Sequence, residues 1–275
     1  MTPNQERKVA FVTGASRGIG RAAAIALAEH GYDVVVTART VVEGESADGR
    51  PLPGSITSTA EEVRKRGQEA LPIRLDLLDE ASIREALETT RREWGPIDVL
   101  LNNGIYTGPE NMVHVLDIEA DEMEKLFRAN VFAPTLITQL VLPEMLERNQ
   151  GTLINMVSAA GFNDPPAPAG QGGWGYAYAA SKAAITRMVG VLAAEHAKSA
   201  LRFFNVEPGF VMTEAMHLND PDGELSKRQA GAPPAAPAAV IAWLATHPDA
   251  DKWKGQTVSA QPLCLELELI PDWRA

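Results

Sequence analysis

Short runs of Val, Ile and Leu alternate with amphipathic segments along this chain, and this alternation constrains the fold more than any single motif does. The runs are apolar throughout, without alternating polarity, which is typical of strands buried on both faces of a sheet. The repeated β-α order predicts an α/β fold, a doubly wound parallel sheet of about seven strands with right-handed crossovers and helices on both faces. The runs are residues 9–13, 34–37, 71–75, 99–101, 153–157 and 203–206, and the segments between them include 21–29, 60–66 and 81–93.

Length and charge narrow the class of protein. We expect all 275 residues to form one domain. A net charge of −11 and the lack of Lys or Arg runs argue against a nucleic-acid partner. No apolar run approaches the ~18 residues of a membrane span, and the polar N-terminus does not resemble a secretory leader. The only cysteine, Cys264, cannot form an internal disulfide, so a cytoplasmic protein is expected.

Two further features suggest no metal site and no thiol chemistry. The five histidines are scattered without the spacing of metal ligands. Cys264 lies in an apolar, strand-like run at 263–269 without a nearby histidine, and we interpret it as buried filler.

A glycine-rich turn follows the first apolar run. Its glycines permit a tight turn and close backbone approach to a pyrophosphate, and the next helix offers free N–H groups at its positive end. The alternative is a Gly-rich turn without a ligand, which the strand before it and the helix after it make less favoured. The predicted cofactor-binding residues here are Gly14, Ser16, Arg17, Gly18, Ile19 and Gly20.

The second apolar run ends without the acid that would bind the ribose 2′-OH of NAD. Its tip carries Arg39 instead, and Arg39 and Arg17 are placed to meet a 2′-phosphate. This favours NADP(H) over NAD(H), the alternative being that both arginines are merely exposed. Residues 41–56 are predicted to be an inserted surface loop beside the adenosine pocket, with a helix resuming at Ser58 and Glu61 at capping-box spacing.

Polar residues follow the third and fourth runs, at the sheet edge where ligands of such folds bind. Asp76, with Leu77 beside it, is predicted to contact the adenine; the alternative for Asp76 is a helix cap, which Asp79 would serve better. Asn103 and Gly104 let the chain pass close to the adenosine ribose, although an ordinary turn would look similar.

The candidate catalytic pair lies on a helix predicted at 175–197. Tyr178 and Lys182 are four apart, so their Cβ atoms lie roughly 5–6 Å from each other on one face. A neighbouring ammonium is expected to lower the pKa of a phenol from ~10, making it a general acid or base. The alternative is an ordinary solvent-exposed contact, which Tyr and Lys four residues apart on a helix often form. Tyr176 competes as the phenol, but the fourth residue after it is Ala180.

Two more polar residues are placed near this pair. Ser158 follows the fifth run at the same sheet edge, where its hydroxyl can donate to a substrate oxygen; small residues are also ordinary at strand ends. Asn130 lies in a long helical segment, 121–146, four residues before Pro134, which cannot donate to its carbonyl. We therefore expect the helix to bend there and to leave the Asn130 carbonyl oxygen free as an acceptor. The alternative is a kink without a function.

Together these residues resemble the short-chain dehydrogenase/reductase family, a Rossmann-fold family, over about residues 9–258. The glycine turn is similar to its cofactor loop, Asp76 to its adenine-binding acid, and Asn102-Asn103-Gly104 to its Asn-Asn-Ala-Gly motif. The resemblance implies a catalytic tetrad and a Pro-Gly turn that holds the nicotinamide carboxamide. The tetrad residues are Asn130, Ser158, Tyr178 and Lys182, and those of the turn are Pro208, Gly209, Val211 and Thr213.

Three departures from the family pattern stand out. Gly104-Ile105 replaces Ala-Gly, the gap from Ser158 to Tyr178 is longer than usual, and the usual Asp-Gly-Gly after the last strand is replaced at 259–262. The last two lie where the family shapes its substrate pocket.

The leading hypothesis is therefore an NADP(H)-dependent oxidoreductase that interconverts a carbonyl and an alcohol. In it, Tyr178 transfers the proton, Ser158 holds the substrate oxygen, and Lys182 lowers the tyrosine pKa and binds the nicotinamide ribose. Asn130 connects Lys182 to solvent through a water. The alternatives are an NAD-linked alcohol dehydrogenase working oxidatively and a non-catalytic NADP(H)-binding sensor.

The substrate and the assembly are less constrained. A largely apolar pocket wall predicts an apolar small-molecule substrate, and resemblance of the long helices to the family's interface helices implies a homodimer or homotetramer. The predicted wall residues are Ile105, Tyr106, Phe162, Trp174, Phe210, Met212 and Met216.

Overall fold

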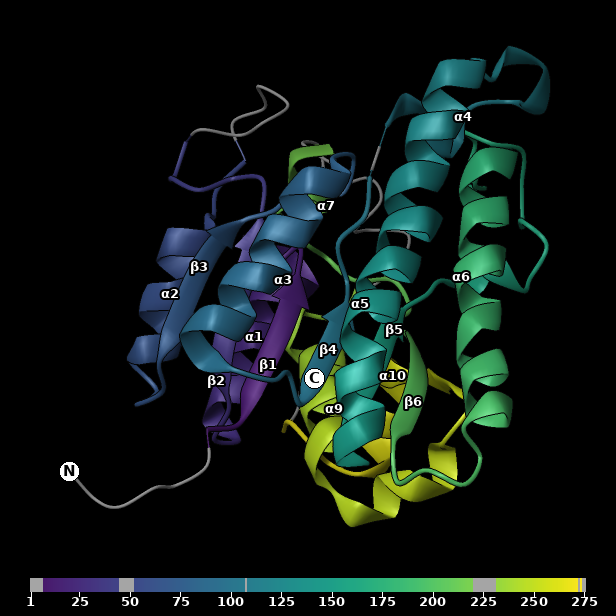
Figure 1. Cartoon of the computed structure of the whole chain (residues 1–275). Coiled ribbons are helices and arrows are strands. Elements are labelled where there is room, and N and C mark those ends of the chain that lie inside the picture. Colours follow the sequence, from purple (N-terminus) through teal and green to yellow (C-terminus); the bar gives the residue numbers. More distant parts are fainter. Residues whose placement is uncertain (1–6, 45–51, 107, 220–230, 272, 274–275) are drawn as a thin grey trace.

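A seven-stranded parallel sheet forms the centre of the computed structural model (Figure 1), which describes residues 7–44, 52–106, 108–219, 231–271 and 273. The strand order is β3-β2-β1-β4-β5-β6-β7, and every neighbouring pair is parallel. The predicted doubly wound α/β fold is confirmed. The strands are β1 Val9–Thr13, β2 Asp33–Ala38, β3 Ala70–Arg74, β4 Val99–Asn102, β5 Thr152–Met156, β6 Arg202–Glu207 and β7 Thr257–Ser259.

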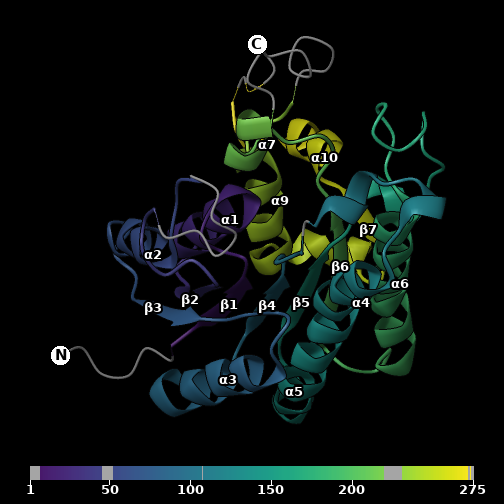
Figure 2. The same ribbon diagram turned by 90° about the horizontal axis from the view of Figure 1, so that it is seen from above.

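Helices cover both faces of the sheet, as the view from above shows (Figure 2). One apolar core lies between the sheet and α1 (Gly18–Glu29), α2 (Ile56–Arg64), α9 (Ala235–Thr246) and α10 (Ala260–Glu266). A second core lies between the opposite face and α3 (Glu80–Trp94), α5 (Ala133–Arg148) and α6 (Tyr176–Glu195). Burial on both faces explains why the strands read as continuous apolar runs.

The shorter elements lie on the connections. They are α4 Ala120–Phe127, α7 Glu214–Asn219, and the 3₁₀ segments Pro109–Met112, Val115–Asp117, Ala159–Gly161 and Pro248–Trp253. Among the described residues, none of the helices combines the length and apolarity that crossing a bilayer requires.

The strand order reverses between β1 and β4, and this switch point positions the site. The chain leaves β1 and β4 toward opposite faces, which opens a crevice at their carboxyl ends. The glycine turn follows β1 and Asn103 follows β4, so both lie beside that crevice.

The start of α2 differs from the prediction that a helix resumes at Ser58. Ser55 is the N-cap: its hydroxyl accepts from the Ser58 N–H at 3.0 Å, and the Ser58 hydroxyl accepts from the Ser55 N–H at 3.1 Å. The capping box therefore uses two serines and begins three residues earlier. In the 41–56 loop, residues 45–51 lie outside the described part, whereas Leu52 and Ser55 are buried, so its end folds inward.

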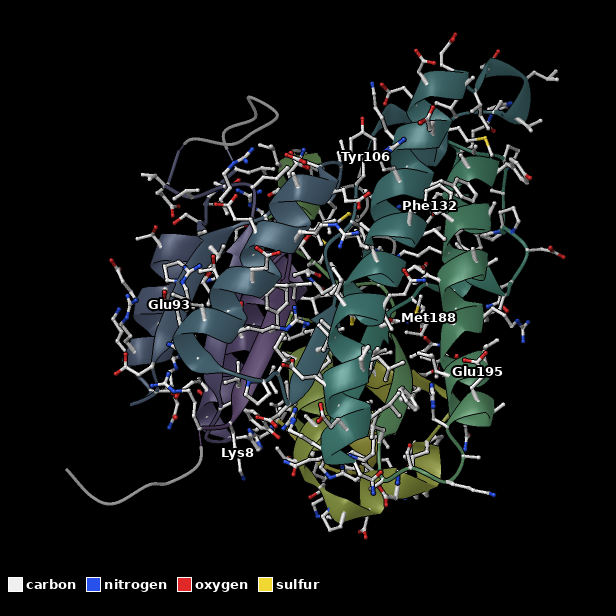
Figure 3. All side chains as sticks on the ribbon, in the orientation of Figure 1. Lys8, Glu93, Tyr106, Phe132, Met188 and Glu195 are labelled. Atoms are coloured by element: carbon white, nitrogen blue, oxygen red, sulfur yellow. The ribbon has the colours of Figure 1, made fainter. Side chains whose placement is uncertain are left out.

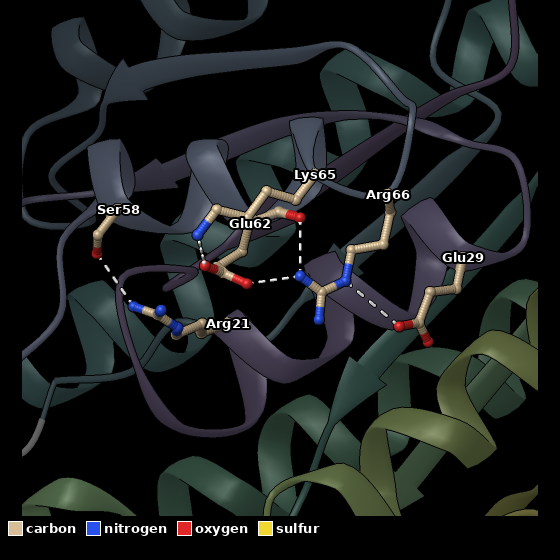
Figure 4. Close-up of polar contacts among 6 residues, drawn as sticks. All are labelled: Arg21, Glu29, Ser58, Glu62, Lys65 and Arg66. Carbon is tan, nitrogen blue, oxygen red and sulfur yellow. Dashed lines mark hydrogen bonds and ion pairs between the residues drawn. The ribbon is translucent and has the colours of Figure 1, made fainter.

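Polar contacts hold α2 beside α1 (Figure 4). Arg21 donates to the Ser58 hydroxyl at 3.0 Å, and Arg66 pairs with Glu29 at 3.4 Å and Glu62 at 2.5 Å. Hydrogen bonds from Lys65 and Arg66 lower the pKa of Glu62 to about 2. These contacts fix the two helices that border the loop at residues 52–55.

The predicted long helix of 121–146 is interrupted where a bend was expected. Residues Arg128–Phe132 form a π-helical turn between α4 and α5, and the Ala133 N–H bonds to the Arg128 carbonyl five residues back. Pro134 follows directly, at the start of α5. A π turn accommodates the missing N–H of proline without breaking the helix.

The apolar run around Cys264 is helical, not strand-like. It belongs to α10, which packs against α9 in the first core, and Cys264 is fully buried. The short run could not be assigned by periodicity alone.

Candidate active site

A cavity of about 290 Å³ opens at the carboxyl ends of β1, β2 and β4. Many predicted cofactor-binding residues line it, and so do several that sequence reasoning missed. The predicted ones are Gly14, Ser16, Arg17, Gly18, Ile19, Gly20, Arg39, Asp76, Leu77, Asn103, Gly104 and Thr213. The missed ones are Ala38, Thr40, Leu52, Leu75, Leu78, Ala129 and Ala215. Tyr178, Lys182, Pro208, Gly209 and Val211 lie outside its lining.

The glycine turn needs its glycines for two separate reasons. Gly14 and Gly18 have φ of 66° and 56°, a left-handed conformation that other residues rarely adopt. A Cβ on Gly20 would lie 2.2 Å from the Gly14 carbonyl oxygen, so the helix could not pack this closely. The turn can therefore be this tight only because glycine stands at these positions.

Asn103 ties the end of β4 to the glycine turn. Its side-chain amide donates to the carbonyls of Thr13 at 2.9 Å and Gly14 at 3.2 Å. The N–H groups of Asn103 and Gly104 both donate to the Thr13 hydroxyl at 2.9 Å. Asn103 therefore shapes the floor of the cavity across the switch point.

The two arginines predicted to meet a 2′-phosphate differ in their surroundings. Arg17 donates to the carbonyls of Pro53 and Gly54, both at 3.0 Å, and to the Thr40 hydroxyl at 3.4 Å. Its guanidinium thus anchors the folded-in end of the 41–56 loop. Arg39 is half-buried and lines the cavity directly.

Asp76 is not the cap of α3. Asp79 caps that helix by accepting from the N–H groups of Ala81 and Ser82. Asp76 instead accepts from the Leu78 N–H at 3.0 Å and lines the cavity. The sequence had favoured Asp79 as the cap, and the structure confirms it.

Ser158 and Tyr178 meet at the ends of β5 and α6. Ser158 directly follows the short extension of β5, Tyr178 lies in the first turn of α6, and the Ser158 hydroxyl is close enough to the phenol to lower its pKa. The Ser158 oxygen also accepts from the Ala160 N–H at 3.3 Å, which holds the serine in place. Two residues far apart in sequence thus present adjacent hydroxyls.

The pKa of Tyr178 is raised in the folded protein, whereas the sequence predicts that it is lowered. Burial raises the pKa of the phenol, the hydrogen bond from Ser158 lowers it in part, and the Glu207 carboxylate raises it further. Lys182 itself is only 4% exposed; its Nζ donates to the Met156 carbonyl at 2.9 Å, and burial lowers its pKa to about 8. Sharing a helix face does not outweigh the desolvation of both groups.

Asn130 is buried in the π-helical turn and contacts two neighbours through its side chain. Its Oδ1 accepts from the Tyr106 N–H at 2.8 Å, and its Nδ2 lies 3.5 Å from the Ser181 hydroxyl. Asn130 therefore links the chain after β4 to α6. Tyr106, labelled in Figure 3, donates its hydroxyl to Glu122 at 2.7 Å and lines the cavity.

The predicted apolar pocket wall is divided. Ile105 and Tyr106 line the 290 Å³ cavity, whereas Trp174 lines a second cavity of about 360 Å³ with Val113, His114 and other residues before α4 and α6. Phe162 is 52% exposed. Periodicity could not place Phe162 and Trp174, because both lie in the long irregular stretch from 159 to 175.

Two residues near the Pro-Gly turn were missed by sequence reasoning. Gln261 of α10 donates to the carbonyls of Pro208 at 3.0 Å and Phe210 at 2.8 Å. Glu214 accepts from the Gly18 N–H at 2.9 Å. Both contacts join segments that are far apart in the chain, so no local sequence pattern predicts them. Among the described residues, no cluster of His, Cys, Asp and Glu could hold a metal ion.

Comparison with known proteins agrees with this geometry. The family described as short chain dehydrogenase matches residues 8–223. A 7α-hydroxysteroid dehydrogenase from Bacteroides fragilis is 28% identical over 259 residues, 92% of each chain. Oxidoreductase UcpA from Salmonella typhimurium is 32% identical over 206 residues, 75% of this chain and 70% of the relative.

A solved structure supports the same assignment. A short-chain type dehydrogenase/reductase from Mycobacterium marinum matches with a TM-score of 0.76 and 26% identity, over 92% of this chain and 93% of that one. With the parallel sheet, the glycine turn and the family match over most of its length, the chain belongs to the short-chain dehydrogenase/reductase family and is an NAD(P)-dependent oxidoreductase.

Proposed function

We propose that the protein reduces an apolar carbonyl compound to an alcohol with NADPH, with Tyr178 as the proton donor. The observation that carries this proposal is the placement of Ser158 next to the Tyr178 phenol, with buried Lys182 one helical turn later on α6, at the sheet edge that also carries the cavity. The relative that is a 7α-hydroxysteroid dehydrogenase supports an apolar alcohol or carbonyl substrate.

The lining of the cavity suits a dinucleotide. Its glycine turn packs so closely that a Cβ on Gly20 would clash with the Gly14 carbonyl oxygen, and the N–H groups at the start of α1 are suited to bind an anion. Asp76 and Leu77 would hold the adenine end, Gly104 the ribose, and Thr213 the nicotinamide end. The bound nicotinamide supplies the hydride.

Side chains of the protein supply the proton that the substrate carbonyl oxygen takes up. Because burial raises its pKa, Tyr178 is a protonated phenol at neutral pH, the form that gives a proton to a carbonyl oxygen. Ser158 holds that oxygen, and Lys182 offers N–H donors to the nicotinamide ribose. Asn130 fixes the position of the wall through Tyr106.

Replacing Tyr178 by Phe tests the proton donor. Loss of the hydroxyl is expected to lower kcat by about 10²-fold or more, since general acid catalysis contributes that much, while NADPH affinity stays near wild type. The assay is NADPH oxidation across a panel of apolar ketones, with affinity from fluorescence titration. Tyr176→Phe is the matched control, because Tyr176 is 56% exposed two residues earlier on the same helix. Ketone reduction by Tyr178→Phe at the wild-type rate would refute the proposal.

Replacing Arg39 by Ala tests the cofactor preference. Arg39 lines the cavity beside the second strand, so its loss is expected to raise KM for NADPH about tenfold, the scale of a charge-assisted hydrogen bond. KM for NADH should stay within about twofold, which makes NADH the internal control. Equal effects on both cofactors would show that Arg39 does not read the 2′-phosphate and would favour the NAD-linked alternative.

We also propose a homodimer or homotetramer that pairs through the outer face of α5 and α6. On α5, Phe132 and Pro143 are exposed and Leu136 and Leu140 between them are partly buried, and Val191 is exposed on α6. Figure 3 shows Phe132 and Met188 on the two neighbouring helices. An exposed apolar face of this kind is typical of a subunit interface.

A further inference from the structure

A carboxylate lies where the cavity meets the start of α1. The Glu214 Oε2 atom accepts a hydrogen bond from the Gly18 N–H at 2.9 Å. Gly18 is the first residue of α1, and the N-cap residue Arg17 provides no side-chain cap. An acid 196 positions along the chain thus takes over one of the helix's free donors.

The same donors are those that a pyrophosphate needs. Gly18, Ile19 and Gly20 line the cavity from one side, and Thr213 and Ala215, the neighbours of Glu214, line it from the other. A Cβ on Gly18 would lie 3.2 Å from the Thr213 methyl group and 3.8 Å from the Glu214 carboxylate. One N–H cannot give the carboxylate and a phosphate oxygen a full hydrogen bond each, and the two negative charges would repel each other.

We propose that Glu214 sets the affinity for the cofactor: its carboxylate occupies the place of the pyrophosphate at the start of α1 and must leave when the dinucleotide binds. This inference rests on the proposed function, because it requires a dinucleotide in the cavity.

The surroundings allow the side chain to leave without dismantling the segment that carries it. The turn before it is held by Gln261, which donates to the Pro208 and Phe210 carbonyls, and by the Met212 N–H, which donates to the Ala232 carbonyl at 3.0 Å. Thr213, not Glu214, caps α7, since its hydroxyl accepts from the Met216 N–H at 3.3 Å. Rotation of the Glu214 side chain therefore frees the Gly18 N–H.

The test compares Glu214→Gln with wild type by calorimetric titration of NADPH, ADP-ribose and adenosine. Removing the charge is expected to lower Kd for NADPH and ADP-ribose by about two- to tenfold, the scale of a charge at a helix terminus. Adenosine carries no phosphate, so its Kd should not change. Glu214→Asp, one methylene shorter, keeps the charge but loses reach, and should fall between the two.

Glu119→Gln is the matched control: it is an exposed acid at the start of another helix and accepts no capping hydrogen bond. It should leave all three Kd values unchanged. Melting gives a second readout, because Glu214→Gln should lower the Tm of the cofactor-free protein and leave that of the NADPH complex nearly unchanged.

Unchanged or weaker NADPH and ADP-ribose binding in Glu214→Gln would overturn the inference while leaving the proposed function intact. A wild-type protein and variant that bind neither NADPH, NADH nor ADP-ribose would overturn the proposed function, and the inference with it.

Discussion

Lys182 shows how burial decides the chemistry of a single residue. Its ammonium is removed from water and meets one backbone carbonyl, that of Met156, so the charged form is disfavoured. A lysine with a pKa of about 8 is still mostly protonated at neutral pH, but its pKa lies close to that pH. A group that binds beside Tyr178 can therefore change the protonation state of Lys182.

This lowered pKa predicts a pH dependence of stability. The pKa of Lys182 is about 8 in the folded protein and near the ordinary lysine value of 10.5 in the unfolded chain, so between these values the unfolded chain binds more protons. Stability then rises with pH across this window, by on the order of 3 kcal/mol in the cofactor-free protein. Below the window both states carry the charge and the burial cost is fully present; above it, the cost is gone.

Urea denaturation of wild type and Lys182→Met from about pH 7 to about pH 10 measures this effect. The wild type should gain free energy of unfolding relative to the variant as pH rises. Lys198→Met, which removes an exposed lysine after α6, should follow the wild-type pH dependence. Parallel curves for wild type and Lys182→Met would mean that the buried lysine titrates near its ordinary pKa.

Arg17 and Arg39 are of the same residue type and both line the cavity, but they differ in their contacts. Both are predicted to meet a 2′-phosphate, and Arg17 in addition donates to the carbonyls of Pro53 and Gly54. The loop end at residues 52–55 folds inward, and this brings acceptors to Arg17 that the sequence did not indicate.

At the scale of elements, α10, which directly follows β7, holds the Pro-Gly turn. Gly209 has φ of 71°, and a Cβ there would lie 2.4 Å from the Gln261 amide nitrogen. The amide bridges the carbonyls on either side of this glycine. Gln261 is therefore a positioning residue for the turn that leads to Thr213.

Replacing Gln261 by Ala should raise KM for NADPH about tenfold or less, because two hydrogen bonds of ~0.5–1.5 kcal/mol each are lost. Gln261→Glu should be at least as harmful, since a carboxylate cannot donate to either carbonyl. Steady-state kinetics measure both. Gln256→Ala removes an exposed amide that bonds only within its own turn, to the Lys252 carbonyl, and should have little effect. A kcat loss with unchanged KM would show that the clamp acts on something other than cofactor binding.

At the scale of the whole molecule, the sheet's switch point collects the site from distant segments. Residues after β1, β4, β5 and β6 converge on one edge because all strands run parallel. The same architecture places α5 and α6 on the outside of the sheet, where Phe132 and Val191 are exposed in the single chain.

Phe132→Glu should weaken the proposed assembly. A charge in the centre of an apolar interface is costly to bury, so light scattering should detect a shift toward monomer at micromolar concentration. Leu116→Glu is the control, because Leu116 is 94% exposed in the segment before α4 and lies outside the α5–α6 face. An unchanged mass for Phe132→Glu would place the interface elsewhere.

The sequence by itself determined the parallel sheet, the glycine turn and the order of the site residues along the chain. These follow from local causes: apolar runs mark buried strands, and glycines mark the turns that no other residue can make. Strand ends agreed with the structure to within about a residue for the same reason. Gly20 is one such local requirement, because a Cβ there would clash with the Gly14 carbonyl oxygen.

The tertiary structure alone decided the charge state of the site and its long-range contacts. The Tyr178 pKa rises instead of falling because burial, which no local pattern reports, dominates over helical spacing. Glu214 reaches Gly18 across 196 positions, and Gln261 reaches Pro208 across 53. Desolvation and contact between distant segments exist only once the chain has folded.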